Sequence, residues 1–155
     1  MVTFYQSTDH PGDTPAPAVY SRALARPIGA CVAPVMVGAA AAALQGNPVW
    51  GYLLYGLPSA IAVATLWTQF WLMRTTAEIG LRSGQAAVQS VHDIMYGRSP
   101  DWQALHYVRV GRWEVELSVG WRTYTCRPAN WPKYEELRSA AEQAFQSSHS
   151  SPPAT

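Results

Sequence analysis

The residues of this sequence that could do acid–base chemistry are few. His92 and Asp93 are adjacent, a pairing that could serve proton transfer. A general base also needs a positioned partner and a pocket, and the sequence indicates neither. Asp93 lies just before an expected loop, where aspartate commonly caps a helix or a turn. We therefore expect a structural role for this pair and keep an enzyme acting through it as a third hypothesis only.

Metal, thiol and cofactor chemistry have no supporting pattern. The sequence has no C-x-x-C, and no two histidines show ligand spacing. Cys31 falls in an expected membrane span and Cys126 in an expected strand, so we expect no disulfide between them. The glycine motifs that cradle phosphates or present a nucleophilic serine are absent. We expect no catalytic residue, no metal, no cofactor and no small-molecule substrate.

Arginines in the C-terminal half are the candidate binding residues. They are Arg109, Arg112, Arg122 and Arg127. If the expected strands pair as neighbours, several could gather on one exposed sheet face and bind anionic lipid headgroups or a protein partner. Each basic residue near a bilayer surface contributes about 1 kcal/mol to such binding. Glu114 and Glu116 support the alternative, which we favour, that the arginines form cross-strand ion pairs.

The helices of this chain can be predicted from a long stretch that has no charged residue. The chain has 155 residues, and no Asp, Glu, Lys, Arg or His occurs from Pro27 to Met73. A bilayer-spanning helix needs about 20 mostly apolar residues, so this stretch holds two spans and a tight turn. Breaker residues at 45–48 mark the turn. The sequence predicts a two-helix membrane hairpin within residues 22–73, with spans at about 28–44 and 49–73.

The first predicted span carries a row of small residues. Gly38, Ala42 and Gly46 recur every four positions, and such a stripe lets a second helix approach closely. We expect these residues to pack against a second helix; the alternative is that small residues are simply common in membrane helices. Pro58 is expected to kink the second span because proline lacks a backbone donor.

The flanks of the spans predict their orientation. Basic residues flank the pair on its outer sides, at Arg22 and Arg26 before it and at Arg74 and Arg82 after it. The connecting turn is uncharged. The positive-inside rule then places both termini in the cytoplasm of a multi-pass inner-membrane protein.

The two ends of the chain have the composition of disordered segments. Residues 1–21 contain several prolines with Gly12, and residues 147–155 are rich in serine and proline. Such compositions bury too little apolar surface to fold. We expect a disordered leader and a disordered tail.

Residues 74–146 change to alternating apolar and polar positions, which predicts an antiparallel β-meander of about five strands. The strongest strand is expected over 113–119, with Trp113 and Val115 on the buried face. A C-terminal amphipathic helix follows, with Asn130 as its N-cap. The fold class is thus a membrane α-helical hairpin followed by a small α+β domain.

The order of these elements resembles that of small bacterial two-helix membrane proteins with a cytoplasmic PH-like domain. The resemblance rests on the segment 101–105 with Trp102, on Gly120, and on the stretch 131–137, which has the pattern Trp-Pro-x-x-Glu-x-Leu. It implies a partial PH-like barrel of binding or scaffolding type, whereas a full PH barrel has seven strands. It implies no catalysis.

These observations favour a non-enzymatic membrane protein whose β-rich domain serves as a binding or scaffold module. The alternative is an accessory subunit of a larger membrane complex, packed through the small-residue face of the first span. The expected partners are the lipid bilayer and a protein, or a second copy of the chain. The net charge of +1 gives no electrostatic case for nucleic acid.

Overall fold

The computed structural model describes residues 2–149, which form two compact units. One unit is the segment Asp13–Arg74, and the other combines residues up to Gly12 with those from Thr75 onward. The elements, in chain order, are β1 (Thr3–Gln6), α1 (Ala16–Leu44), the π-helix η1 (Tyr52–Gly56), α2 (Leu57–Arg74), β2 (Thr76–Arg82), β3 (Gln85–Ser90), α3 (Val91–Met95), β4 (Trp102–Val110), β5 (Val115–Val119), β6 (Arg122–Cys126), the 3-10 helix η2 (Pro128–Asn130) and α4 (Tyr134–His149).

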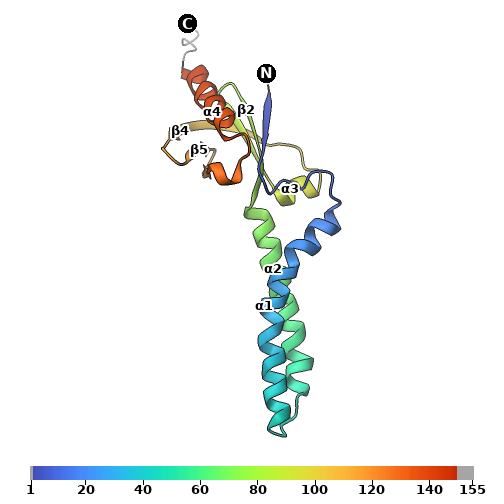
Figure 1. Cartoon of the computed structure of the whole chain (residues 1–155). Coiled ribbons are helices and arrows are strands. Elements are labelled where there is room, and N and C mark those ends of the chain that lie inside the picture. Colours follow the sequence, from blue (N-terminus) through green and yellow to red (C-terminus); the bar gives the residue numbers. More distant parts are fainter. Residues whose placement is uncertain (1, 150–155) are drawn as a thin grey trace. The chain divides into compact units, whose positions relative to one another are not determined.

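The first unit is an antiparallel helical hairpin of α1 and α2 (Figure 1). α1 begins well before the predicted span and contains Pro27 and Pro34. It bends in its first half (Figure 1). A proline inside a helix removes one backbone hydrogen bond and clashes with the preceding turn, which accounts for such a bend. The predicted turn at 45–48 is confirmed, because α1 ends at Leu44.

The second helix departs from α-helical geometry just before Pro58. Residues Tyr52–Gly56 are π-helical, and the backbone N–H of Leu57 donates to the carbonyl of Tyr52, five residues earlier. A proline ring clashes with the carbonyl four residues before it in a regular α-helix. The wider π-turn relieves that clash, so the expected kink takes the form of a local widening.

The side chains of the hairpin lie mostly on its outside. In α1 only Ala39 and Ala42 are buried, while α2 buries one row at four-residue spacing from Ala60 to Leu72. The exposed side chains are large and apolar, among them Val37, Leu54 and Leu66. Both helices are long and apolar enough to cross a membrane.

The second unit is a six-stranded antiparallel sheet in sequence order, β1 to β6. Its first strand overturns the expected disordered leader. Thr3–Gln6 pairs with β2, with Tyr5 opposite Ile79, and α1 already begins at Ala16. The sheet therefore has one strand more than the predicted meander, and the whole helical hairpin is inserted in the chain between two neighbouring strands.

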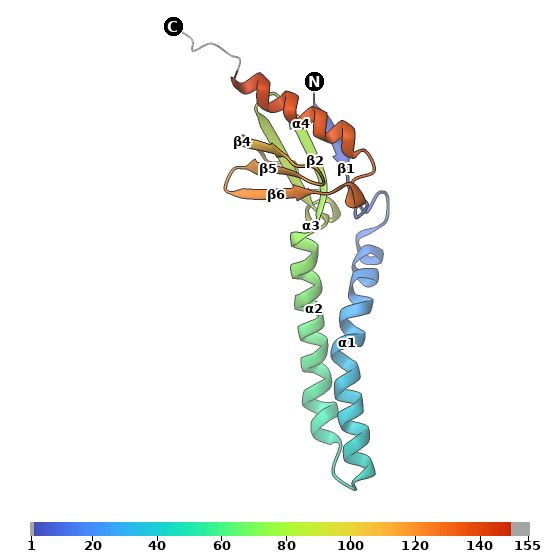
Figure 2. The same cartoon turned by 60° about the vertical axis from the view of Figure 1, so that its left-hand side comes forward.

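A single helix covers one face of the sheet. α4 lies over the strands in Figure 2, and its buried residues Tyr134, Leu137 and Ala141 belong to the same apolar core as Ile79 and Leu117. The predicted C-terminal helix is thus confirmed. Its predicted cap is wrong, because Asn130 ends η2 and α4 begins at Tyr134. The backbone carbonyl of Asn130 instead accepts a hydrogen bond from the N–H of Thr8.

Three local predictions about the C-terminal domain are corrected. Trp113 does not begin the strand after the β4 hairpin, because β5 begins at Val115 and the N–H of Gly111 donates to the carbonyl of Glu114 across a turn. The expected loop after β3 starts with a short helix, α3. The predicted tail is helical through His149, and its remainder, residues 150–155, lies outside the described residues.

Candidate functional site

The acid–base residues lie at the junction between β3 and α3. Ser90 is the N-cap of α3, and its hydroxyl oxygen accepts a hydrogen bond from the backbone N–H of Asp93. The Asp93 carboxylate in turn accepts from the backbone N–H of Ser90, at 3.1 Å, and from its hydroxyl, at 2.6 Å. This reciprocal arrangement is a capping box, which satisfies backbone donors that a helix start leaves unpaired.

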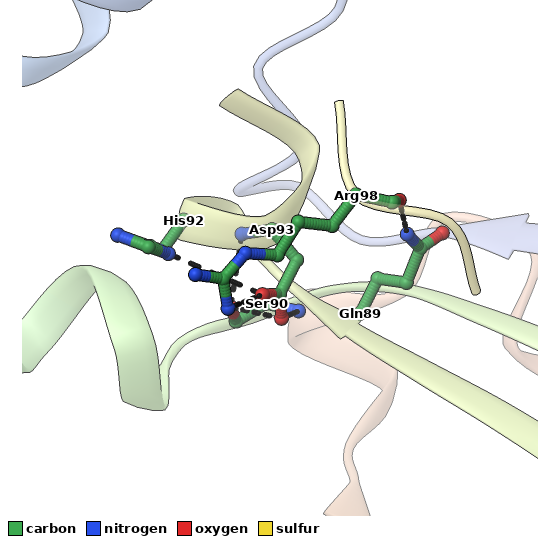
Figure 3. Close-up of polar contacts among 5 residues, drawn as sticks. All are labelled: Gln89, Ser90, His92, Asp93 and Arg98. Carbon is green, nitrogen blue, oxygen red and sulfur yellow. Dashed lines mark hydrogen bonds and ion pairs between the residues drawn. The ribbon is translucent and has the colours of Figure 1, made fainter. Parts of the chain in front are cut away.

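Further contacts close the loop that follows α3 (Figure 3). The Arg98 guanidinium lies 3.4 Å from the Asp93 carboxylate, and the backbone N–H of Arg98 donates to the carbonyl of Asp93. The buried side chain of Gln89 donates to the carbonyl of Arg98 at 2.7 Å. The cluster therefore fixes the connection from β3 toward β4.

The geometry of the cluster is that of a helix cap. Activation of a serine hydroxyl needs a base that accepts its proton, with a third group orienting that base. Here the Ser90 hydroxyl is bonded to Asp93, while the ring of buried His92 packs against Tyr96 and lies 4.0 Å from the Asp93 carboxylate. In the predicted His92–Asp93 pair, the Asp93 carboxylate therefore caps the start of α3.

Electrostatics at Asp93 follow from these contacts. Partial burial by itself raises the pKa of the carboxyl group. The hydrogen bonds from Ser90 and the nearby positive charges of Arg98 and His92 outweigh it, so that the pKa of Asp93 lies below its ordinary value of 3.8.

This shift predicts a pH-dependent contribution to stability. Because the folded-state pKa is depressed, the contribution is complete above the ordinary value and is lost as pH falls through the folded-state pKa. Replacing Asp93 by asparagine should lower the free energy of unfolding by about 1 kcal/mol at neutral pH. In urea unfolding at a series of pH values, the difference in unfolding free energy between wild type and D93N should shrink as pH falls below 3.8, the ordinary pKa of aspartate. A gap that stays constant with pH would contradict this account.

The candidate arginines do not form one patch. Arg109 lies 3.9 Å from the Glu116 carboxylate, and Arg127 lies 3.3 Å from that of Glu114. These are the cross-strand pairs favoured above over a shared basic face. The guanidinium of Arg112 instead lies over the ring of its neighbour Trp113.

Strand register separates Arg122 from the others. Residues directly opposite each other in antiparallel strands share a face. Arg109 is opposite Glu116, whereas Arg122 is opposite Val119, whose side chain is buried in the core. Arg122 therefore lies on the α4-facing side of the sheet, at the edge strand. Among residues 2–149 neither Arg112 nor Arg122 forms an ion pair with a carboxylate.

Two tryptophans stand out in the turns beside these unpaired arginines. Trp121 is fully exposed in the two-residue turn between β5 and β6, and Trp113 is 71% exposed in the turn between β4 and β5. The prediction that Trp113 lies in the core is wrong, although this residue continues the alternation of β5. The glycines at 111 and 120, which mark turns, are the sequence signal that places both aromatics outside the strands.

A second aromatic feature crosses the sheet on the face away from α4. Phe4, Gly80, Ala87 and Trp102 form one row across β1 to β4. The two aromatic rings meet over the small residues between them, with ring centroids 6.0 Å apart. A Cβ atom at Gly80 would lie 2.7 Å from the Phe4 ring, so glycine is needed there for close approach. This row attaches the N-terminal strand to the rest of the sheet.

The small residues of the first helix have different surroundings. A Cβ atom at Gly38 would lie 2.7 Å from Cε1 of Tyr52, and Ala42 is buried, so these two pack within the hairpin. The prediction that Gly46 belongs to this row is wrong, because Gly46 lies in the turn with a φ of 72°, and a Cβ atom there would have no described neighbour within 4 Å. A glycine of the second helix is packed in the same way: a Cβ atom at Gly56 would lie 2.9 Å from Val35 of α1.

Neither metal nor thiol chemistry finds a site in the part of the chain that the structure describes. No group of three histidine, cysteine or carboxylate residues could hold a metal ion among these residues. Cys31 and Cys126 are both free, and burial raises the pKa of the Cys126 thiol to about 12. A thiol with that pKa is a poor nucleophile at neutral pH.

Comparisons of the chain with protein-family models, with curated proteins and with solved structures return no match. The observed architecture is an open six-stranded antiparallel sheet with one covering helix, and no PH fold is identified.

Proposed function

We propose that this chain is a small, non-enzymatic integral membrane protein that anchors a binding or scaffold domain at the surface of a bacterial inner membrane. The observation that carries the proposal is the outward-facing apolar surface of the hairpin. In water, exposed side chains such as Leu66 and Phe70 would be costly, whereas lipid tails accept them. Aromatic residues lie at both ends of the second helix, and at about 1.5 Å per residue Trp50 and Trp71 are about 31 Å apart. That length fits the hydrocarbon core of a bilayer.

Strand pairing supports a topology with both termini on one side. β1 precedes the hairpin and β2 follows it, and the two strands are hydrogen-bonded neighbours. A chain that crosses the membrane between them must cross an even number of times. At the same end of the hairpin lie Arg22, Arg26 and Arg74, whereas the turn at 45–48 carries no charge. By the positive-inside rule, that end and the sheet domain lie in the cytoplasm.

The sheet-and-helix unit is the proposed binding module. Within this proposal it is a partial barrel of PH-like type, an idea that rests on the order of its elements. The capped α3 junction holds a loop within the domain, and Arg109 and Arg127 pair with carboxylates, so the exposed turns are the proposed contact surface for partners. The bilayer and a protein are the proposed partners.

Membrane extraction and cysteine labelling test this proposal together. The full chain is expected to stay in the membrane pellet after washing with alkaline carbonate. An impermeant maleimide added to intact spheroplasts should label Asn47→Cys in the turn, but label Ser139→Cys, on the exposed side of α4, only after permeabilisation. Cys126 gives little background because it is buried. Release by carbonate would refute membrane integration, and labelling of the Ser139→Cys variant from outside would refute the topology.

A further inference from the structure

We propose that the two turns at the ends of β5 dock on the surface of an anionic bilayer, through Arg112 with Trp113 at one end and Trp121 with Arg122 at the other. The inference rests on the proposed function, because it takes the chain to be held in a membrane by α1 and α2. It adds a specific contact between the sheet domain and phospholipid headgroups.

The charges of the domain point to these two turns. Arg109 of β4 and Arg127, which follows β6, form ion pairs with Glu116 and Glu114. Arg112 in the first turn and Arg122, the first residue of β6, have no carboxylate partner among residues 2–149. Of the arginines in residues 102–127, the two without a carboxylate partner thus lie next to the two exposed tryptophans, which suits the negative charge of an anionic leaflet.

The tryptophans are exposed although the domain has apolar surface to cover them. Trp131 is buried in the core, and Trp102 is covered by Phe4 and by the guanidinium of Arg82. Trp113 stays 71% exposed although the Arg112 guanidinium lies over its ring, and Trp121 is fully exposed. An indole is apolar with one polar edge, and this combination favours the headgroup region of a bilayer.

Both turns are held by backbone geometry, so the tryptophans project from fixed positions. Gly120 has a φ of 55°, as the first residue of a two-residue turn requires, and a side chain there would collide with Gln103. In the other turn, the N–H of Gly111 donates to the carbonyl of Glu114 at 2.9 Å. Fixed turns lose little conformational entropy on binding.

The spacing of the turns favours a broad surface over a compact ligand. Trp113 and Trp121 flank the five-residue strand β5. At about 3.3 Å per residue the strand itself spans about 13 Å, so the two turns are separated by at least that length. A bilayer offers phosphate groups over that whole distance, and a domain tethered to membrane helices is always near it. The attraction of each arginine to an anionic leaflet is screened by salt.

The test uses the full chain in nanodiscs of phosphatidylcholine alone or mixed with phosphatidylglycerol. Trp121→Cys and Trp113→Cys are studied one at a time, so that the other turn stays intact, and the rate of labelling by a water-soluble maleimide is measured. Labelling should be about tenfold slower in the anionic nanodiscs, and added salt should restore the rate. Ser139→Cys on α4 is the matched control and should label equally in both.

A second variant separates lipid contact from a folding defect. Arg112→Gln with Arg122→Gln, combined with Trp121→Cys, should abolish the protection while leaving the thermal melting of the domain unchanged. Equal labelling rates in neutral and anionic nanodiscs would overturn the proposal, as would protection seen in native membranes but not in nanodiscs, which would indicate a protein partner. Failure of the proposed function is distinguishable, since the chain would then be released by carbonate.

Discussion

Replacing Tyr5 by alanine is expected to lower the free energy of unfolding of the sheet-and-helix domain by about 3 kcal/mol. Tyr5 is only 7% exposed and belongs to the core that α4 covers, opposite Ile79 of β2. Removing its ring leaves a cavity lined by residues that follow the helical hairpin in the sequence. The measurement is urea unfolding of the full chain in mild detergent, followed by pulse proteolysis.

The neighbouring residue on the same strand provides the control. Gln6 lies on β1 but its side chain is exposed, so Gln6→Ala should change the unfolding free energy by less than about 0.5 kcal/mol. If both variants unfold like the wild type, β1 is not part of the folded domain and the leader is disordered as composition alone suggests. Hydrogen exchange at the β2 amides gives an independent readout, because loss of β1 would expose them.

Replacing Gly38 by leucine is expected to separate the two helices of the hairpin. The Cβ position already lies 2.7 Å from the Tyr52 ring, so three further carbons cannot fit without moving η1 away from α1. Overpacking of this kind costs about 1–3 kcal/mol. Thermal unfolding in detergent, followed by circular dichroism, should show a lower midpoint for Gly38→Leu.

Two further variants make that result specific. Ala40→Leu enlarges an exposed position on the same helix and should leave the midpoint unchanged. Tyr52→Ala should restore much of the stability of Gly38→Leu, because it removes the ring that the leucine displaces. If Gly38→Leu instead keeps its midpoint but loses co-migrating chains in native sizing, the small residues serve an accessory subunit's interface.

Part of the candidate site could be predicted from the local sequence, namely the buried positions of β5 and the capping role of Asp93. Alternation along 115–119 correctly separates buried Val115, Leu117 and Val119 from their outward neighbours. Asp93 is expected to cap or to turn the chain before a loop, and its carboxylate is part of a capping box, although the sequence pattern does not predict the helix that it caps. The same alternation misleads at Trp113, because the turn that begins at Gly111 extends to Glu114 and β5 starts only at Val115.

The ion-pair partners of the arginines could not be predicted from local sequence pattern. Their number and types are plain in the sequence, but their partners depend on which residues face each other across strands. A register that puts Arg109 opposite Glu116 and Arg122 opposite Val119 places these two arginines on opposite faces of the sheet. Register is set by the packing of the whole sheet.

The hairpin, the turn between its helices and the C-terminal helix could all be predicted from local sequence. Each depends on the solvent preference of a continuous run of residues, such as the uncharged stretch from Pro27 to Met73. Three features required the folded chain: Thr3–Gln6 is a strand, Tyr52 fills the space beside Gly38, and two of the four arginines stay unpaired among the described residues. A four-residue strand has little stability alone. It forms because β2, about 70 residues later, supplies its hydrogen bonds and its core, and no local pattern encodes a partner at that distance.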